Sequence, residues 1–231
     1  MKRTFVIGDI HGAHKALLQC LDRSRFDREH DRLIALGDVC DGWPQVRECF
    51  DELLQLKHLE YIIGNHDHWG LEWATLGVKP DIWTSQGGEA TLASYGQAGM
   101  PAAHKELLNN AHWYLLEGDR LFVHGGINPT QPLEQQTKDI FLWDRNLLVL
   151  AQRFSITDPD FRFGNYSEIY VGHTTTQMFH LKEPSHFCNV WAMDTGAGWS
   201  GSLSIMDIAT KQFWQSDPVL ELYPGIRGRR H

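Results

Sequence analysis

The sequence predicts an α/β fold, because short strand-like apolar runs alternate with helix-like segments and end at polar residues. Runs rich in Val, Ile, Leu and Phe are separated by segments whose apolar residues recur at helical spacing. This alternation is typical of βαβ units around a largely parallel sheet. Most of the strand-like runs stop beside Asp, Asn or His. Ligands commonly bind at the carboxyl ends of such strands, so these ends form the candidate functional site.

The alternation is clearest in the first third of the chain. It predicts strands over residues 5–7, 32–36 and 60–63, with helices over 15–21 and 45–56 between them. Each helical segment places its apolar side chains on one face, as a helix that covers a sheet must do.

The remainder of the chain is less regular. Residues 68–118 and 128–164 are predicted helical and loop insertions that border the site, and 105–116 is their clearest helix. Further strands are predicted over 121–123, 168–171, 189–193, 202–208 and 212–215. Because no repeat, low-complexity run or linker interrupts the sequence, residues 1–231 are expected to form a single domain.

Composition excludes several classes of function. The net charge of −8 disfavours binding to duplex nucleic acid through counterion release. No apolar run approaches the roughly 18 residues of a membrane-spanning helix, and the N-terminal apolar run is too short for a signal peptide. Four cysteines without paired metal spacing indicate a reducing compartment. We expect a cytoplasmic protein whose basic stretch, Arg227 to Arg230, is a solvated tail.

Five apolar runs end in side chains that bind metal ions. These are Asp9 and His11, Asp38 and Asp41, Asn65 and His66, His124, and His173, and a sixth run ends at Asp194. Carboxylates, an amide oxygen and imidazoles without thiolates suit manganese, iron, zinc or similar ions. The set exceeds one tetrahedral site, which favours two ions sharing a carboxylate. Two ions about 3.5–4 Å apart can hold both the attacking and the leaving oxygen of a displacement at phosphorus.

The same segments resemble the motifs of the calcineurin-like metallophosphoesterases. The matching segments are Gly8-Asp9-Ile10-His11-Gly12, Gly37-Asp38-x-x-Asp41, Gly64-Asn65-His66-Asp67, His124-Gly125-Gly126 and Gly172-His173. Residues 87–95, 143–145 and 194–197 are similar to the bacterial phosphoprotein-phosphatase branch, which includes serine/threonine phosphatases and symmetrical diadenosine-tetraphosphate hydrolases. The resemblance implies two facing mixed β-sheets flanked by helices, with the metal site at the carboxyl ends of strands.

The resemblance also implies a role for each polar residue. Asp9, His11 and Asp38 would hold the first ion, and Asp38, Asn65, His124 and His173 the second, with Asp38 bridging. Manganese is the expected metal; iron, zinc, nickel, cobalt and magnesium remain alternatives. A hydroxide bridging the two ions would be the nucleophile. His66 would protonate the leaving group, oriented by Asp41 through its other ring nitrogen.

Two positions depart from the pattern of this branch. Gly42 stands where an arginine usually follows Asp41, and Ile63 stands where a second arginine often precedes Gly-Asn-His. Arg145 is then the remaining candidate to hold the phosphate, since arginine binds phosphate through two parallel hydrogen bonds. Trp43 is predicted to form an aromatic wall of the substrate site.

The predicted function is hydrolysis of phosphomonoesters, with phosphoserine, phosphothreonine or phosphotyrosine in proteins as substrates. The alternative is a nucleotide phosphoanhydride or phosphodiester hydrolase such as a diadenosine-tetraphosphatase. A diester or an internal anhydride carries one negative charge at the reacting phosphate, so it needs fewer arginines for binding than a terminal phosphate with two. A non-catalytic scaffold is a minor alternative; in such a protein we would expect some of the metal-binding residues to be replaced. The sequence makes no prediction of oligomeric state.

Overall fold

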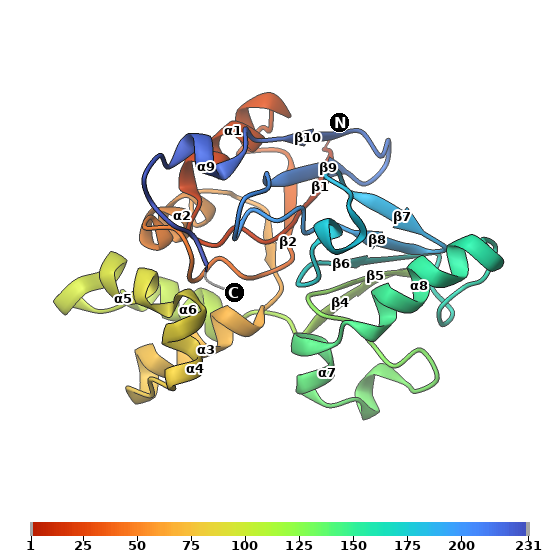
Figure 1. Cartoon of the computed structure of the whole chain (residues 1–231), viewed down its shortest axis with the longest axis horizontal. Helices are drawn as coiled ribbons and strands as arrows, with labels where there is room; N and C mark the ends of the chain where they lie inside the picture. Colours follow the sequence, from red (N-terminus) through yellow and green to blue (C-terminus); the bar gives the residue numbers. More distant parts are fainter. Residues whose placement is uncertain (1, 230–231) are drawn as a thin grey trace.

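Residues 2–229, the part of the chain that the computed structural model describes, form two five-stranded mixed β-sheets with helices around them (Figure 1). The first sheet has the order β10 (Phe213–Gln215), β9 (Ser204–Asp207), β1 (Thr4–Ile7), β2 (Arg32–Ala35) and β3 (Leu59–Tyr61). The second has the order β4 (Tyr114–Glu117), β5 (Arg120–Val123), β6 (Glu168–Val171), β8 (Val190–Ala192) and β7 (Ser185–Phe187).

Each sheet contains three neighbouring parallel strands. In the second sheet they are β5, β6 and β8, with β4 and β7 antiparallel on either side. In the first sheet they are β1, β2 and β3, with β3 at the edge; β9 pairs antiparallel with β1, and β10 pairs antiparallel with β9. The carboxyl ends of parallel strands meet at one edge of a sheet. The loops that carry the predicted ligands therefore leave each sheet on one side.

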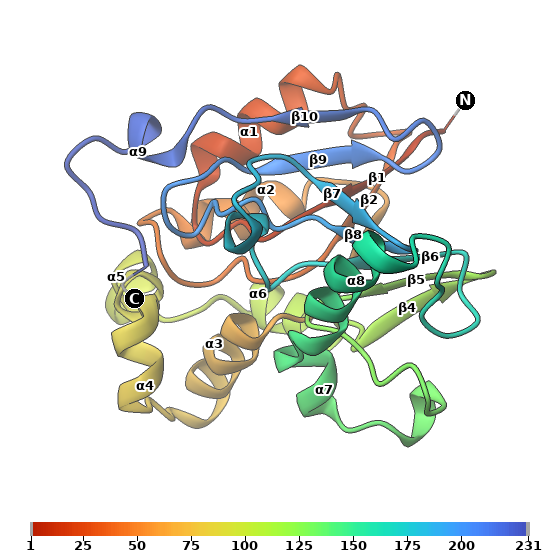
Figure 2. The same cartoon turned by 45° about the vertical axis from the view of Figure 1, so that its right-hand side comes forward.

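Helices cover the outer faces of both sheets. On the first sheet lie α1 (His14–Arg23), α2 (Val46–Leu53) and α9 (Val219–Leu222), and on the second lies α8 (Asn146–Thr157), preceded by α7 (Lys138–Trp143). Helices α3 (Asn65–Leu76), α4 (Asp81–Trp83), α5 (Glu89–Tyr95) and α6 (Ala102–Asn109) form a separate helical region (Figure 2). Short helical turns lie at Thr84–Gly88, Gly96–Ala98, Leu133–Gln135 and Thr176–Phe179.

The two sheets face each other across an apolar core of their own. Val6 and Ile34 from the first sheet meet Phe122 and Tyr170 from the second, and all four are fully buried. The rings of Phe122 and Tyr170 stack with their centroids 4.8 Å apart. This core holds the two sheets together. It therefore also holds together the two halves of the site, which lies at the strand ends.

The structure corrects the predicted helix over 105–116. Helix α6 ends at Asn109, and Tyr114–Glu117 instead forms β4, which pairs antiparallel with β5. A turn through Gly118, at φ 60°, joins the two strands into a hairpin. Pairing with β5 overrides the local helical spacing, as tertiary context often does. Among residues 2–229 no helix is long and apolar enough to cross a membrane, and all four cysteines are free thiols.

Candidate metal centre and its neighbours

The loops after the parallel strands bring the predicted ligands into one buried cluster. The side chains of Asp9, His11, Asp38, Asn65, His124 and His173 are each less than 5% exposed. Close backbone approach requires glycine beside two of them. A Cβ atom on Gly64 would overlap the carboxylate of Asp38, and one on Gly172 would overlap that of Asp9.

Two groups of three side chains bring potential ligand atoms within 4.8 Å of one another. One contains Asp9, His11 and Asp38, and the other contains Asp38, His124 and His173. Asp38 belongs to both groups, as a bridging ligand must. Asn65 adjoins the second group, with its Oδ1 3.0 Å from His124 Nε2.

Several atoms of this cluster lack the hydrogen bonds that buried polar atoms normally make. Within residues 2–229, Asp38 Oδ2, His173 Nε2 and Asp194 Oδ2 are buried without a hydrogen-bond partner. Asp38 Oδ2 lies 3.3 Å from His124 Nε2 and 3.7 Å from His11 Nε2. Oxygen and nitrogen atoms converging in this way fit divalent cations of the manganese, iron and zinc type.

Backbone carbonyls orient two of the imidazoles. His11 Nδ1 lies 3.0 Å from the carbonyl oxygen of Cys40, and His124 Nδ1 lies 2.7 Å from that of Leu36. A carbonyl only accepts, so each Nδ1 donates, and Nε2 is the nitrogen whose lone pair can bind a metal ion once it carries no proton. Both rings therefore present a metal-binding nitrogen to the cluster.

The charged side chains of the cluster lie close enough together to shift one another's pKa values. Burial, Asp194 and Asp38 hold the pKa of Asp9 well above its usual range. Burial would also raise the pKa of Asp38, but His124 and His66 outweigh it and hold that pKa well below normal. Burial would lower the pKa of His124, but Asp38 and Asp9 raise it to about 9. Crowded carboxylates of this kind are stabilised by a bound cation.

Asp67 positions the bridging aspartate, a role that the sequence reasoning missed. Its carboxylate accepts hydrogen bonds from five donors: the backbone amides of Asp38 (2.7 Å), Val39 (2.9 Å), Cys40 (3.0 Å) and Gly64 (3.1 Å), and the hydroxyl of Tyr61 (2.9 Å). The loop after β2 and the start of α3 are thereby bound to one side chain. At that helix start the amide of His66 donates to Asp38 Oδ1 at 2.9 Å.

His66 and Asp41 form a buried pair beside the cluster. His66 Nδ1 lies 2.5 Å from Asp41 Oδ2, and that carboxylate also accepts from Trp83 Nε1 (2.8 Å) and Thr91 Oγ1 (2.6 Å). Burial lowers the pKa of His66 to about 3 and raises that of Asp41 to about 8. Between these two pKa values the pair holds one proton between Nδ1 and Oδ2. The outer nitrogen, Nε2, then carries a hydrogen whichever partner holds the shared proton.

Of the two residues predicted to contact substrate, Arg145 is accessible and Trp43 is not. Arg145 is exposed at the rim, and its Nη1 donates to the carbonyl oxygen of His173 at 2.9 Å. Trp43 is 0% exposed, its Nε1 donates to the carbonyl oxygen of Ala197 at 2.7 Å, and its ring stacks on Tyr223. The prediction that Trp43 forms a substrate wall is therefore wrong, because core packing covers the whole ring.

The prediction of a solvated basic tail is wrong for Arg229, although Arg227 is exposed. Arg229 is half-buried, and its Nη1 lies 3.1 Å from Nε2 of His11. Another unpredicted neighbour is Trp143, which is 39% exposed with its ring centroid 5.9 Å from that of His173. Trp143 belongs to the 143–145 segment matched in the sequence, but neither its place beside His173 nor that of Arg229 beside His11 follows from local pattern, because both depend on long-range packing. Arg230 lies outside the described residues.

Comparison with known proteins identifies relatives along most of the chain. Residues 2–186 match the family model for the calcineurin-like phosphoesterases. The chain is 28% identical over 214 residues to serine/threonine-protein phosphatase 1 of Salmonella typhimurium, covering 90% of this chain and 92% of that protein. It is also 28% identical over 171 residues to the symmetrical bis(5'-nucleosyl)-tetraphosphatase of Nitrosomonas europaea, covering 74% of this chain but only 58% of that protein.

Solved structures share the same fold at low identity. A serine/threonine phosphatase of Saccharomyces cerevisiae matches with a TM-score of 0.61 and 14% identity, covering 98% of this chain and 82% of that one. A cold-active protein-tyrosine phosphatase of Shewanella matches with a TM-score of 0.58 and 17% identity, covering 94% and 81%. The fold and the ligand cluster define a metallophosphoesterase, and the chain belongs to the calcineurin-like phosphoesterases. Two predictions are thereby confirmed: the fold of two mixed sheets, and the class of a metal-dependent phosphoric ester hydrolase.

Proposed function

We propose that this protein is a phosphatase that hydrolyses phosphomonoesters, with phosphorylated serine, threonine or tyrosine in proteins as substrates. The observation that carries the proposal is the buried His66–Asp41 pair next to two ligand groups that share Asp38. The similarity to a serine/threonine-protein phosphatase over nearly its whole length supports the choice of substrate.

In the proposed site, Asp9, His11 and Asp38 hold one ion, and Asp38, Asn65, His124 and His173 hold the other. We propose manganese for both. Divalent ions held there supply a Lewis acid for the phosphoryl oxygens and lower the pKa of water toward neutrality. Asp67 keeps Asp38 in the position that serves both groups, through the backbone amides that it accepts.

His66 is the proposed proton donor to the leaving oxygen. Its ring centroid lies 5.1 Å from that of His11, so it borders the ligand cluster, and its Nε2 is buried without a partner among the described residues. Asp41 holds the opposite nitrogen, which fixes the direction in which Nε2 points. A positioned acid of this kind contributes about 10²–10⁴-fold to the rate.

Arg145 is proposed to bind a phosphoryl oxygen at the rim of the site. One guanidinium nitrogen is held by the carbonyl oxygen of His173 and, at 3.3 Å, by Thr174 Oγ1. An arginine has five N–H donors, so others stay available for an anion.

The second candidate function is hydrolysis of a dinucleoside polyphosphate. Two observations favour it: the similarity to a symmetrical bis(5'-nucleosyl)-tetraphosphatase, and the partly exposed ring of Trp143 beside His173. An exposed aromatic ring at the site can stack on a nucleobase. The same ring can also hold the ring of a phosphotyrosine, so it does not by itself separate the two functions.

The test is a substrate panel with added manganese, nickel, cobalt, magnesium or zinc. We expect phenyl phosphate to be hydrolysed faster than bis-phenyl phosphate or diadenosine tetraphosphate, and a reversed order would support the second function. His66→Asn should lower kcat about 10²–10⁴-fold on phenyl phosphate and much less on 4-nitrophenyl phosphate, whose leaving group needs no protonation. His68→Asn is the matched control, because His68 lies on the same helix with its side chain 36% exposed.

Equal losses on both substrates would contradict the role of His66 as proton donor. Metal analysis accompanies each variant. Protein that binds no metal ion and stays inactive after manganese is added would instead support the scaffold alternative.

A further inference from the structure

The segment after α9 leads back into the metal centre and ends, in the described part, at Arg229. Both views show it descending from α9 toward α5 (Figures 1 and 2). The backbone amide of Arg229 donates to the carbonyl oxygen of Gly198 at 2.9 Å. Its guanidinium lies over the ring of Trp199, 4.4 Å from the centroid, and its Nε donates to the carbonyl oxygen of Gln86 at 3.3 Å. The side chain is therefore held at several points.

Three glycines leave room for the aliphatic part of this side chain. A Cβ atom on Gly42 would lie 3.3 Å from Arg229 Cγ, one on Gly87 3.1 Å from the same atom, and one on Gly198 3.2 Å from Arg229 Cδ. All three distances are tighter than an ordinary van der Waals contact. The Arg229 side chain thus occupies the space beside residue 42, where the sequence lacks the arginine expected after Asp41.

The guanidinium has only neutral hydrogen-bond partners among the described residues. They are the backbone carbonyl and the side-chain amide of Gln86, and the Nε2 of His11. His11 is neutral here because its Nδ1 donates to Cys40 and its Nε2 accepts. The carboxylates of Asp38 and Asp194 attract this cation but form no hydrogen bond with it among the described residues. Its N–H donors can therefore form charge-assisted hydrogen bonds with an anion, and these are stronger than neutral ones.

The contact with His11 connects this cation to the metal centre. An imidazole nitrogen has one lone pair, so an ion bound at His11 Nε2 and the Arg229 contact exclude each other. Binding of the ion would release the Nη1 donors, while Gln86 and Trp199 still hold the rest of the side chain. Those donors would then face an anion that is bound at the ion.

We propose that Arg229 binds the phosphoryl group of the substrate on the His11 side of the metal centre, in the space beside Gly42. The inference rests on the proposed function and names the residue that holds its anionic substrate. Together with Arg145 near His173, it places one arginine on each side of the ligand cluster.

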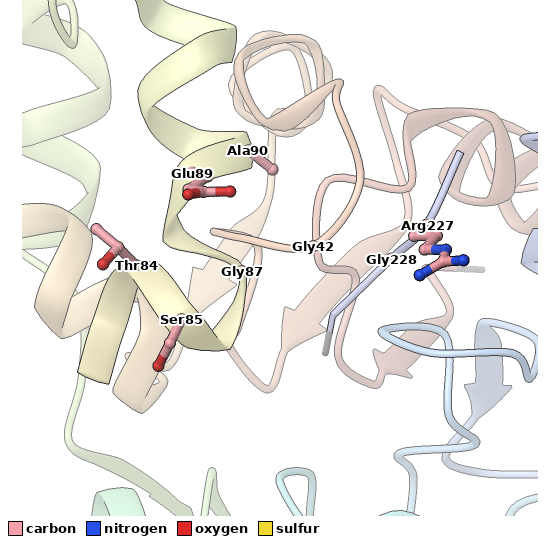
Figure 3. Close-up of a pocket in the computed structure, with 8 residues that line it drawn as sticks. All are labelled: Gly42, Thr84, Ser85, Gly87, Glu89, Ala90, Arg227 and Gly228. Carbon is pink, nitrogen blue, oxygen red and sulfur yellow. The ribbon is translucent and has the colours of Figure 1, made fainter. Parts of the chain in front are cut away.

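Arg227 provides a matched control on the same segment. A pocket of about 150 Å³ lies between this segment and residues 84–90, lined in part by Gly42, Gly87 and Gly228. Figure 3 shows the Arg227 side chain on the side away from Thr84 and Ser85. Arg227 is exposed, so its replacement removes a positive charge two residues from Arg229 without removing the contact with His11.

The experiment measures binding of inorganic phosphate by calorimetry to manganese-loaded wild-type, Arg229→Gln, Arg229→Lys and Arg227→Gln proteins. Metal content and thermal unfolding are measured on the same samples. We expect Arg229→Gln to weaken phosphate binding about 10- to 100-fold, as the loss of charge-assisted hydrogen bonds does. Arg229→Lys should keep part of the affinity, and Arg227→Gln should change it less than about twofold.

Two results would overturn the inference. Unchanged phosphate affinity in a folded, metal-loaded Arg229→Gln protein would show that the side chain is only structural. Higher metal affinity and faster turnover in that variant would show that Arg229 blocks the site. Failure of the proposed function is distinguishable, because wild-type protein would then bind phosphate through Arg229 and yet hydrolyse no phosphomonoester.

Discussion

Substitution of Trp43 tests whether this residue stabilises the core or binds substrate. Its indole is fully buried, stacks on Tyr223 with centroids 5.0 Å apart, and donates to the carbonyl oxygen of Ala197. Trp43→Phe keeps an aromatic ring but leaves that carbonyl without its donor, which should lower the free energy of unfolding by about 1–3 kcal/mol. Trp43→Ala also removes the stacked ring and should cost about 3–5 kcal/mol.

The assay is urea unfolding at a fixed manganese concentration, combined with steady-state kinetics on phenyl phosphate. The KM of folded Trp43→Phe should stay near that of wild type, because no part of the ring reaches solvent. Trp143→Ala is the contrasting control: its ring is 39% exposed beside His173, so we expect a higher KM and a stability change below about 1 kcal/mol. A raised KM with unchanged stability in Trp43→Phe would refute the assignment of Trp43 to the core.

Three further predictions follow from the buried carboxylates. In differential scanning fluorimetry, chelation of metal ions should lower the melting temperature and added manganese should restore it. Manganese at a hundredfold excess over its Kd should add about 2.7 kcal/mol to the free energy of unfolding. Asp38→Ala should abolish this dependence of the melting temperature on manganese. Asp67→Ala leaves five donors without an acceptor and should lower the free energy of urea unfolding by at least about 2 kcal/mol. The free energy of metal binding should fall by more than the free energy of unfolding does. Burial would raise the pKa of Asp31, but hydrogen bonds from Arg3 and Asp27 outweigh it and lower that pKa. The ionised Asp31 therefore stabilises the fold fully above the unfolded pKa of about 3.9, and this contribution is lost as the pH falls through the lower folded pKa. The difference in unfolding free energy between wild type and Asp31→Asn should therefore shrink below about pH 4. A difference that stays constant with pH would contradict this.

The local pattern of apolar residues was sufficient to predict most elements in the first half of the fold. The strands expected at residues 5–7, 32–36 and 60–63 correspond to β1, β2 and β3, because short buried strands need continuous apolar runs that survive in any context. The strand β4 was missed, because its strand conformation depends on pairing with β5 and not on its local apolar pattern. The single domain over 1–231, the cytoplasmic location and the choice of manganese stay predictions.

The candidate site was predictable because its residues follow strands directly. Asp9, Asp38, His124 and His173 each come one or two residues after the apolar stretch that carries them, so the parallel arrangement alone brings them to one edge. Their assembly into two groups sharing Asp38 agrees with that reasoning, and their binding of metal ions stays a prediction.

The sequence by itself determined the fold class, the family and the chemical types at the strand ends, because these depend on local periodicity and on short motifs. Only the tertiary structure decided which aromatic and cationic side chains reach the site. Trp43 is adjacent in sequence to the Asp41 loop yet packs into the core, whereas Arg229 is 218 residues from His11 and contacts it. Proximity in sequence fixes the backbone path but not the direction of a side chain, which depends on the space that distant segments leave. Here the glycines at positions 42, 87 and 198 leave that space, and Arg229 fills it.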